Sequence, residues 1–272
     1  MTNAYSPLRL VLLGAVLLVF LLPPVWLFVS ALKPQAEIFA WPPTLLPADP
    51  TLENFIAAIS RARFLTFFRN SAVVCLLSAT LSVTISVMAG YALAKFRFRG
   101  DTLLFMLIMS SLMVPLQIVL IPVFLVLRDL GLLNTLAGLI IAPAATPTGV
   151  FLMRQYIVNI PDSLLEAARL DGTPEWRILL RIIVPLSLPA IGTLMAFNLV
   201  WRWNDYLWPF LIVNDQEMWT VQMAIANSVG RFGIDWPKLL SMSVLSVLPV
   251  LVVFTLLQRL LMGGIMAGAT KE

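Results

Sequence analysis

The stretch NIPDSLLEAARLDGTPEWRILLRIIVPLSLP, residues Asn159–Pro189, interrupts a very apolar chain with a concentration of charge. Residues 154–181 hold eight of the 32 charged residues, so about a tenth of the chain carries a quarter of the charge. Apolar segments lie on both sides and are long enough to cross a bilayer, which needs ~20 residues. We therefore expect this stretch to be the largest water-exposed element of a membrane protein.

Local signals predict a short helix in the first half of the stretch. Pro161 marks a helix start, and Ser163 with Glu166 fits a capping box in which each side chain bonds the other's backbone amide. The helix runs to about Leu170, and Gly172 supplies the left-handed position that commonly ends a helix. Two roles are possible for Glu166: it can cap this helix, or it can contact a partner protein.

A second helix is predicted directly after the first. Thr173 is a suitable N-cap, and Pro174 suits the first helical position because its missing N–H has no helical partner there. We expect the helix to cover residues 175–183 and to break before Pro185. The two helices would then meet at an angle at Gly172.

The composition predicts an all-α polytopic membrane protein. The chain has 272 residues, of which 60% are hydrophobic and 12% charged, with a mean hydropathy of +0.94. Soluble domains average about 45–50% apolar and about 25% charged residues. These values exclude an ordinary soluble enzyme and a disordered chain, and the length leaves room for about six spans.

The sequence contains six separate apolar segments. We predict a first region, residues 1–69, with one span and an extracytoplasmic loop, and a core of five spans in residues 70–272. The predicted spans are about Leu10–Leu32, Asn70–Ala94, Thr102–Leu127, Thr135–Ile157, Leu188–Val213 and Leu239–Leu261.

The distribution of basic residues predicts the orientation in a cell membrane. With the N-terminus inside, the inside loops carry ten Lys and Arg residues and the outside loops seven. Because short cytoplasmic loops are enriched in Lys and Arg, both termini and the 159–189 loop are expected in the cytoplasm.

Several kinds of chemistry are missing from the sequence. There is no histidine, which is the commonest general base and a common metal ligand. The single cysteine, Cys75, lies in an apolar run, so a disulfide framework and a cysteine-rich metal site are excluded. The chain also lacks a phosphate-binding Gly-Lys-Ser/Thr loop. We therefore expect no metal site and no cofactor in this chain.

The predicted fifth span contains a cluster of polar residues, which are costly in a bilayer unless they are paired or face water. Asn198, Arg202 and Asp205 follow helical spacing, and Arg202 needs a partner in a bilayer, for which Asp205 is the obvious choice. Asn204 and Tyr206 lie beside them. The aromatic residues here fit either a membrane-interface belt or a sugar-stacking surface, so this group is a candidate pathway lining or gate.

The 159–189 stretch also resembles a known family. Glu166-Ala167-Ala168, then Gly172, then the run Ile182–Pro185 match the EAA loop of ATP-binding-cassette (ABC) importer permeases, with Val184 where the family has Leu. Three further segments resemble the carbohydrate branch of this family, which includes disaccharide and glycerol-phosphate permeases. They are FLMRQY at 151–156, WNDYLWP at 203–209 and QR at 258–259.

The resemblance implies a type I importer permease fold of six transmembrane helices and no enzymatic activity in this chain. It implies an importer of a sugar or sugar-like solute in the inner membrane of a prokaryote. The partners implied are a second permease, an extracytoplasmic solute-binding protein and two ATPase subunits, which bind the ATP and Mg²⁺. The residues implied to couple to the ATPase are Glu166, Ala167, Ala168, Arg169, Asp171 and Gly172.

Two other classes of function compete with this hypothesis. An ion-coupled secondary transporter predicts ionisable residues in several spans and often an internal repeat, whereas only Arg202 and Asp205 occur away from the cytoplasmic ends of the predicted spans, both in one span. An intramembrane enzyme predicts a metal constellation, a Ser–Lys pair or paired aspartates within spans, and none is found in the sequence.

Overall fold

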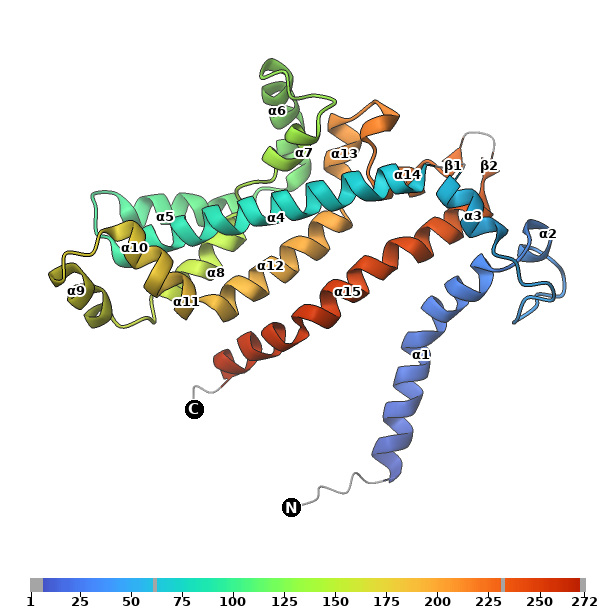
Figure 1. Ribbon diagram of the computed structural model, residues 1–272, viewed down its shortest axis with the longest axis horizontal. Coiled ribbons are helices and arrows are strands. Elements are labelled where there is room, and N and C mark those ends of the chain that lie inside the picture. Colours follow the sequence, from blue (N-terminus) through green and yellow to red (C-terminus); the bar gives the residue numbers. More distant parts are fainter. Residues whose placement is uncertain (1–6, 61–62, 231–232, 270–272) are drawn as a thin grey trace. The chain divides into compact units, whose positions relative to one another are not determined.

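The structure is a computed structural model that describes residues 7–60, 63–230 and 233–269 (Figure 1). Its α-helices are α1 (Pro7–Ala31), α2 (Gln35–Ile38), α3 (Glu53–Ser60), α4 (Phe64–Lys95), α5 (Asp101–Ser110), α6 (Leu116–Asp129), α7 (Leu136–Ile141), α8 (Pro147–Ile157), α9 (Asp162–Leu170), α10 (Glu175–Ile178), α11 (Val184–Leu186), α12 (Leu188–Trp203), α13 (Leu207–Ile212), α14 (Val221–Ala226) and α15 (Trp236–Ala269). A two-residue antiparallel pair, β1 (Val229–Gly230) with β2 (Gly233–Ile234), is the sheet that the described residues form. The predicted all-α class is therefore confirmed.

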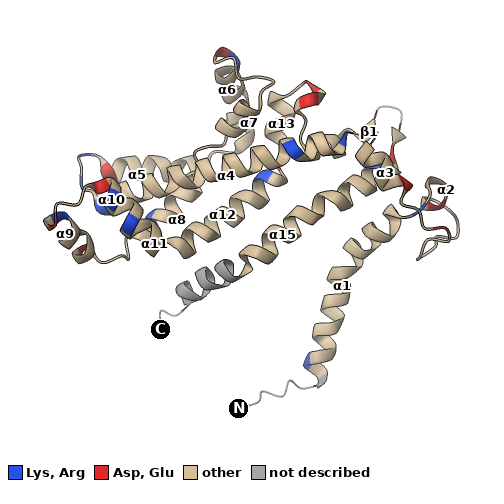
Figure 2. Cartoon of the chain, in the orientation of Figure 1, with Lys and Arg blue, Asp and Glu red and all other residues tan. Residues whose placement is uncertain are grey.

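The long apolar helices match the predicted spans in part. Within the described residues, α1, α4 and α15 are each long and apolar enough to cross a membrane. Two bent helix pairs raise the number of candidate spans to as many as five. The predicted fourth span is divided between α7 and α8, which residues 142–146 separate. Figure 2 shows the long helices mostly without charge, whereas charged residues gather on α9, α10 and the segments around α2 and α3.

The predicted third span is not one straight helix. It consists of α5 with a 3₁₀ turn (Ser111–Met113), followed by α6, and the two parts meet at 108°. The break falls at Val114 and Pro115, whose backbones are extended. Proline lacks an N–H and disfavours helix in the residue before it, so the chain turns here.

The predicted fifth span is also interrupted. α12 ends at Trp203, and the chain re-forms a short helix only at α13. Residues 204–206 between them lack regular structure. The predicted helix to Val213 is therefore wrong beyond Trp203.

The chain forms two compact units, and each has its own packing. One combines residues 1–65 with 224–248, and the other combines 66–223 with 249–272. In the second unit, α8 contacts both α5 and α12, and α13 contacts α6 and α7. In the first, α1 exposes its apolar side chains from Leu8 to Trp26, whereas Ala31 at its end is buried.

Small residues allow α4 to approach α8 closely. A Cβ atom placed on Gly90 would lie 2.7 Å from the Cβ of Met153 and 2.8 Å from the backbone N of Arg154. A Cβ on Gly149 of α8 would collide with the Ser86 hydroxyl. The small residues of the second predicted span thus permit the close helix contact expected of them in lipid.

We predict that Gly90→Ala destabilises the protein. The added methyl would lie within 3.0 Å of backbone atoms of α8, so the backbone must shift, and overpacking of this kind costs about 1–3 kcal/mol. The unfolding midpoint of purified protein in detergent should fall. The control is Gly14→Ala in α1, where no atom lies within 4 Å of the added Cβ. Equal midpoints for both variants would contradict the proposed contact.

Candidate functional site

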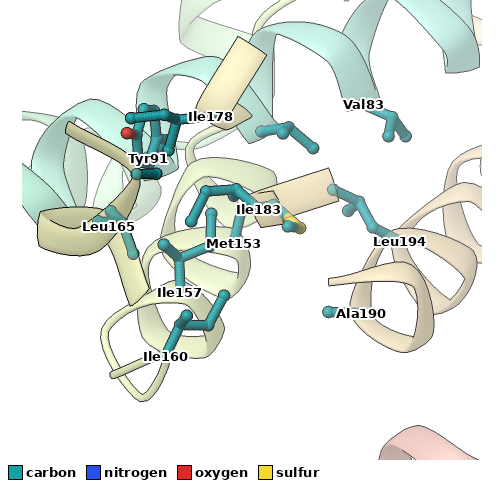
Figure 3. Close-up of a cluster of buried hydrophobic side chains, with 12 residues drawn as sticks. Val83, Tyr91, Met153, Ile157, Ile160, Leu165, Ile178, Ile183, Ala190 and Leu194 are labelled. Carbon is teal, nitrogen blue, oxygen red and sulfur yellow. The ribbon is translucent and has the colours of Figure 1, made fainter. Parts of the chain in front are cut away.

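The buried face of α9 fixes this helix to a hydrophobic cluster. Leu165 is 1% exposed, and Ala168 is buried beside it. Both belong to a cluster that includes Met153 and Ile157 of α8 and Ile178 of α10 (Figure 3). The amphipathic pattern of α9 is therefore used to hold the helix against the rest of the second unit.

The start of α9 differs from the predicted capping box. The helix begins at Asp162 with Pro161 as N-cap, and no side-chain capping bond forms. Ser163 therefore lies inside the first turn, and the predicted reciprocal bonds with Glu166 are wrong. Proline provides a fixed backbone geometry at the start instead. The predicted end is confirmed, because α9 stops at Leu170 and Gly172 is left-handed with φ of +71°.

The second predicted helix starts and ends differently. Pro174, rather than Thr173, is the N-cap of α10, and it makes no side-chain capping bond. The helical path then continues through a π-helical segment (Leu179–Ile183) into α11, which contains Pro185. The expected break before Pro185 is wrong, because the wider π turn accommodates the proline without an ordinary helical bond to its nitrogen.

One carboxylate joins both short helices to α4. Glu175 Oε1 accepts a hydrogen bond from Arg169 Nε at 2.7 Å, and Glu175 Oε2 accepts one from the Tyr91 hydroxyl at 2.7 Å. Arg169 also lies 5.6 Å from the centroid of the Phe96 ring. The hydrogen bond to Glu175 raises the pKa of Arg169, so this guanidinium stays charged. We call Tyr91, Arg169 and Glu175 the Glu175 joint.

A second anchor holds the start of α9. Lys95, at the end of α4, bonds Asp162 Oδ1 at 2.6 Å and also donates to the carbonyl oxygens of Ile160 and Val158. The Lys95 side chain is only 5% exposed. Its hydrogen bond lowers the pKa of Asp162, which keeps this carboxylate ionised.

The outward face of α9 combines carboxylates with exposed apolar groups. Glu166, Ala167 and Asp171 are exposed, and Leu170 is 89% exposed. Trp176 of α10 is exposed beside an Arg177 guanidinium 4.9 Å from its ring. Exposed apolar side chains next to charges are typical of a protein-binding surface. We call Leu164, Glu166, Ala167, Leu170, Asp171 and Trp176 the outward face.

The six residues implied by the resemblance do not share one role in the structure. Ala168 packs inward, and Arg169 is committed to the Glu175 joint. Glu166, Ala167, Asp171 and Gly172 are exposed. Sequence reasoning missed the anchoring residues Tyr91, Lys95, Asp162 and Glu175. No local spacing signals them, because their partners lie up to 84 positions away.

The second candidate group centres on a buried ion pair. Arg202 Nη1 lies 3.6 Å from Asp205 Oδ2, and the two side chains are 8% and 13% exposed. Arg202 Nη2 also donates to the Pro143 carbonyl at 3.3 Å, and Asp205 Oδ1 accepts from the Trp208 amide at 3.3 Å. The predicted Arg202–Asp205 pairing is therefore present.

The cavity beside this pair is too small for a sugar. Its volume is about 10 Å³, which is roughly the space of one water molecule. No described residue hydrogen-bonds to Arg202 Nε or Thr220 Oγ1, although both atoms are buried. The cavity is lined by Ser71, Val74, Leu139, Arg202, Asp205, Trp208, Pro209 and Thr220.

The other predicted pathway residues do not join this pair. Asn198 is buried, and its amide donates to the Leu194 carbonyl one turn back at 2.9 Å. Asn204 is exposed and closes the end of α12 with a 2.8 Å bond to the Val200 carbonyl. Tyr206 is exposed and stacks on Phe210. The structure therefore separates the five residues into a buried pair and three individually placed side chains.

Polar side chains fasten residues 204–221 to α4. Asn70 donates to the carbonyl oxygens of Glu217 and Trp219 at 2.7 and 3.0 Å. The Ser71 hydroxyl accepts from the Val221 amide at 2.8 Å. These bonds satisfy backbone groups that an irregular segment leaves open.

One described cysteine lies close to this region. Cys75 is buried, and its thiol donates to the Leu199 carbonyl of α12 at 3.2 Å. It therefore reports on the contact between α4 and α12. The described residues contain no group of three or more Cys, Asp or Glu side chains that could hold a metal ion.

Similar proteins are membrane components of transport systems. The arabinooligosaccharides transport system permease protein AraQ of Halalkalibacterium halodurans is 32% identical over 90% of this chain and 89% of its own length. The osmoprotective compounds uptake permease protein GgtD of Synechocystis is 35% identical over 93% and 88%. The sn-glycerol-3-phosphate transport system permease protein UgpE of Brucella suis is 31% identical over 94% and 93%.

A solved structure shares the fold. One chain of a bacterial ABC transporter involved in the import of the acidic polysaccharide alginate aligns with a TM-score of 0.83 and 26% identity, covering 95% of this chain and 99% of that one. The family model for binding-protein-dependent transport system inner membrane components matches residues 82–265. The chain therefore belongs to this family of inner membrane transport components and has the ABC importer permease fold.

Proposed function

We propose that this chain is the permease subunit of an ABC importer for a sugar or sugar-like solute. Relatives named for arabinooligosaccharides, sn-glycerol-3-phosphate and diacetylchitobiose support this class of substrate. In this proposal the chain forms half of the pathway with a second permease. Two ATPase subunits bind ATP and Mg²⁺ in the cytoplasm, and a solute-binding protein delivers the solute from outside.

The observation that carries the coupling proposal is the two-sided character of α9. Its inward face is fixed by Leu165 and the Glu175 joint, whereas its outward face exposes apolar groups beside Glu166 and Asp171. A helix that is packed tightly on one side and exposed on the other can pass a movement of a bound partner to the helices it packs against. We propose that the ATPase docks on the outward face, which places α9, α10 and both termini in the cytoplasm.

The route of transmission follows the anchors. A displacement of α9 reaches α4 through Lys95 and through Tyr91 of the Glu175 joint. It reaches α12 through the continuous helical path of α10, the π segment and α11, which ends in an 80° bend before α12. Two spans thus receive the motion of one docking helix.

We further propose that the Arg202–Asp205 pair is a latch at a gate rather than a sugar-binding site. The pair holds the end of α12 to Pro143 and to the start of α13, and its cavity has no room for a sugar. Its two charges also compensate each other, which leaves no unpaired carboxylate there for ion coupling. This favours the ATP-driven hypothesis over the secondary transporter.

Glu166→Lys tests the docking face. The substitution reverses a charge on the exposed surface without touching the anchors, so we expect folding and membrane insertion to be unchanged. Co-purification with the ATPase should fall at least several-fold, and ATP-dependent uptake should fall with it, because a like-charge contact replaces an attraction. The measurement is ATPase recovered per permease, together with uptake in vesicles.

The matched control is Asp129→Lys, which reverses an exposed carboxylate at the end of α6. It should leave ATPase recovery and uptake at the wild-type level. If Glu166→Lys retains full ATPase binding, the outward face is not the docking surface.

The labelling rate of Cys75 measures the effect of substitutions in the Arg202–Asp205 pair. Arg202→Met leaves Asp205 buried without its partner, which typically costs about 3–5 kcal/mol. We expect the α4–α12 contact to loosen and Cys75 to react faster with a water-soluble maleimide. Arg128→Met, which removes an exposed arginine paired with Asp129, should leave the labelling rate unchanged.

The double variant Arg202→Met/Asp205→Leu separates folding from gating. Replacing both charges by apolar groups removes the burial penalty, so the protein should insert normally. A latch predicts that uptake stays reduced in this variant. Full recovery of uptake would show that the pair only compensates charge.

A further inference from the structure

The loop that follows α1 exposes large apolar side chains and turns charged side chains inward. Four large apolar side chains are exposed, and we call them the apolar tip: Phe39, Trp41, Leu45 and Leu46. Trp41 is 91% exposed. The neighbouring charged residues, Lys33 and Glu37, instead form hydrogen bonds to other residues of the loop. Large apolar groups that are exposed together in one short loop indicate an interaction surface.

The charged residues hold the tip in a defined shape. Lys33 is 3% exposed, donates to the Thr44 carbonyl and lies 4.8 Å from the centroid of the Trp26 ring. Glu37 Oε1 accepts from the Thr44 hydroxyl at 2.7 Å and from the Ala48 amide at 2.9 Å. The apolar tip is therefore presented by a built loop.

The loop starts and finishes at the end of a membrane span. The Thr51 amide donates to the Leu32 carbonyl at 2.8 Å. The Asn54 amide group donates to the carbonyl oxygens of Ala31 and Lys33, both at 2.9 Å. Ala31 is the last residue of α1, so both arms of the loop are tied to the end of this candidate span.

A second span end lies at the same place. The Phe39 ring meets the Trp236 ring edge-on, with centroids 5.3 Å apart. Trp236 is the first residue of α15, another candidate span. Tryptophan is enriched where membrane spans meet the lipid headgroups. Phe39 of the apolar tip thus lies directly beside the start of α15.

The backbone of the tip is also suited to a poorly hydrated environment. Residues 38–48 contain no charged side chain and include Pro42, Pro43 and Pro47. Proline has no N–H, so three backbone donors that lipid would leave unsatisfied are missing. The Ala48 amide and the Thr44 carbonyl are already bonded within the loop.

We propose that the apolar tip inserts into the lipid interface of the leaflet where α1 ends, as an anchor beside the span. In this position the four side chains contact lipid at the boundary between headgroups and acyl chains. Continuity with α1 and the start of α15 favours lipid over a protein partner. The anchor fixes the level of α1 in the membrane, since both arms of the loop are tied to its end.

A single-cysteine label tests this position. In a Cys75→Ala background, Leu45→Cys places an environment-sensitive fluorophore on the tip and leaves Trp41 in place. The matched control is Asp49→Cys, four residues further along the same loop and also exposed. The full chain, with the subunits that co-purify with it, is reconstituted into phosphatidylcholine–phosphatidylglycerol vesicles without solute-binding protein.

The readouts are quenching by lipids with a spin label near the headgroup and quenching by aqueous iodide. We expect the label at 45 to be quenched several-fold more strongly by the lipid than the label at 49, with the opposite order for iodide. Strong iodide quenching at 45 would overturn the proposal. Protection from both quenchers would show that a protein subunit covers the tip, and would overturn it as well. Neither readout depends on uptake or ATPase docking, so the result is independent of the proposed function.

Discussion

The carboxylate of Glu175 is the interaction on which the coupling region depends. It receives one hydrogen bond from Arg169 of α9 and one from Tyr91 of α4, so a single residue of α10 ties three helices together. Charge-assisted hydrogen bonds of this kind are stronger and more directional than neutral ones. Gly172 permits the turn that brings Arg169 and Glu175 together, because its left-handed backbone is unfavourable for other residues.

The membrane imposes a second constraint, which explains where polar side chains occur. Breaks in the apolar helices leave backbone groups without helical partners, and lipid supplies none. Asn70 bonds the Glu217 and Trp219 carbonyls, and Asn134 accepts from the Asn214 and Asp215 amides. Arg202 serves the Pro143 carbonyl in the same way. Asn70, Asn134 and Arg202 therefore support irregular segments, which are the parts of a transporter best suited to move.

The sequence predicted the class of the protein and its most informative loop. Apolar runs, the charge concentration near residue 166 and the left-handed Gly172 depend on local chemistry, which the sequence displays directly. The capping box at Ser163 was wrong because Pro161 already sets the start of α9. The break before Pro185 was wrong because a π-helical segment absorbs the proline. Partners far apart in sequence, such as Lys95 with Asp162 or Glu175 with Tyr91, carry no local signal and require the fold.

A double-mutant cycle on the Glu175 joint tests the central claim most directly. Arg169→Met, Glu175→Gln and the double variant would be compared by solute molecules transported per ATP hydrolysed in vesicles. If the joint carries motion from α9 to α4, each single variant lowers this ratio, with ATPase binding retained. The double variant is then no worse than either single one, since both remove the same link. Unchanged ratios, or losses that simply add, would contradict the account.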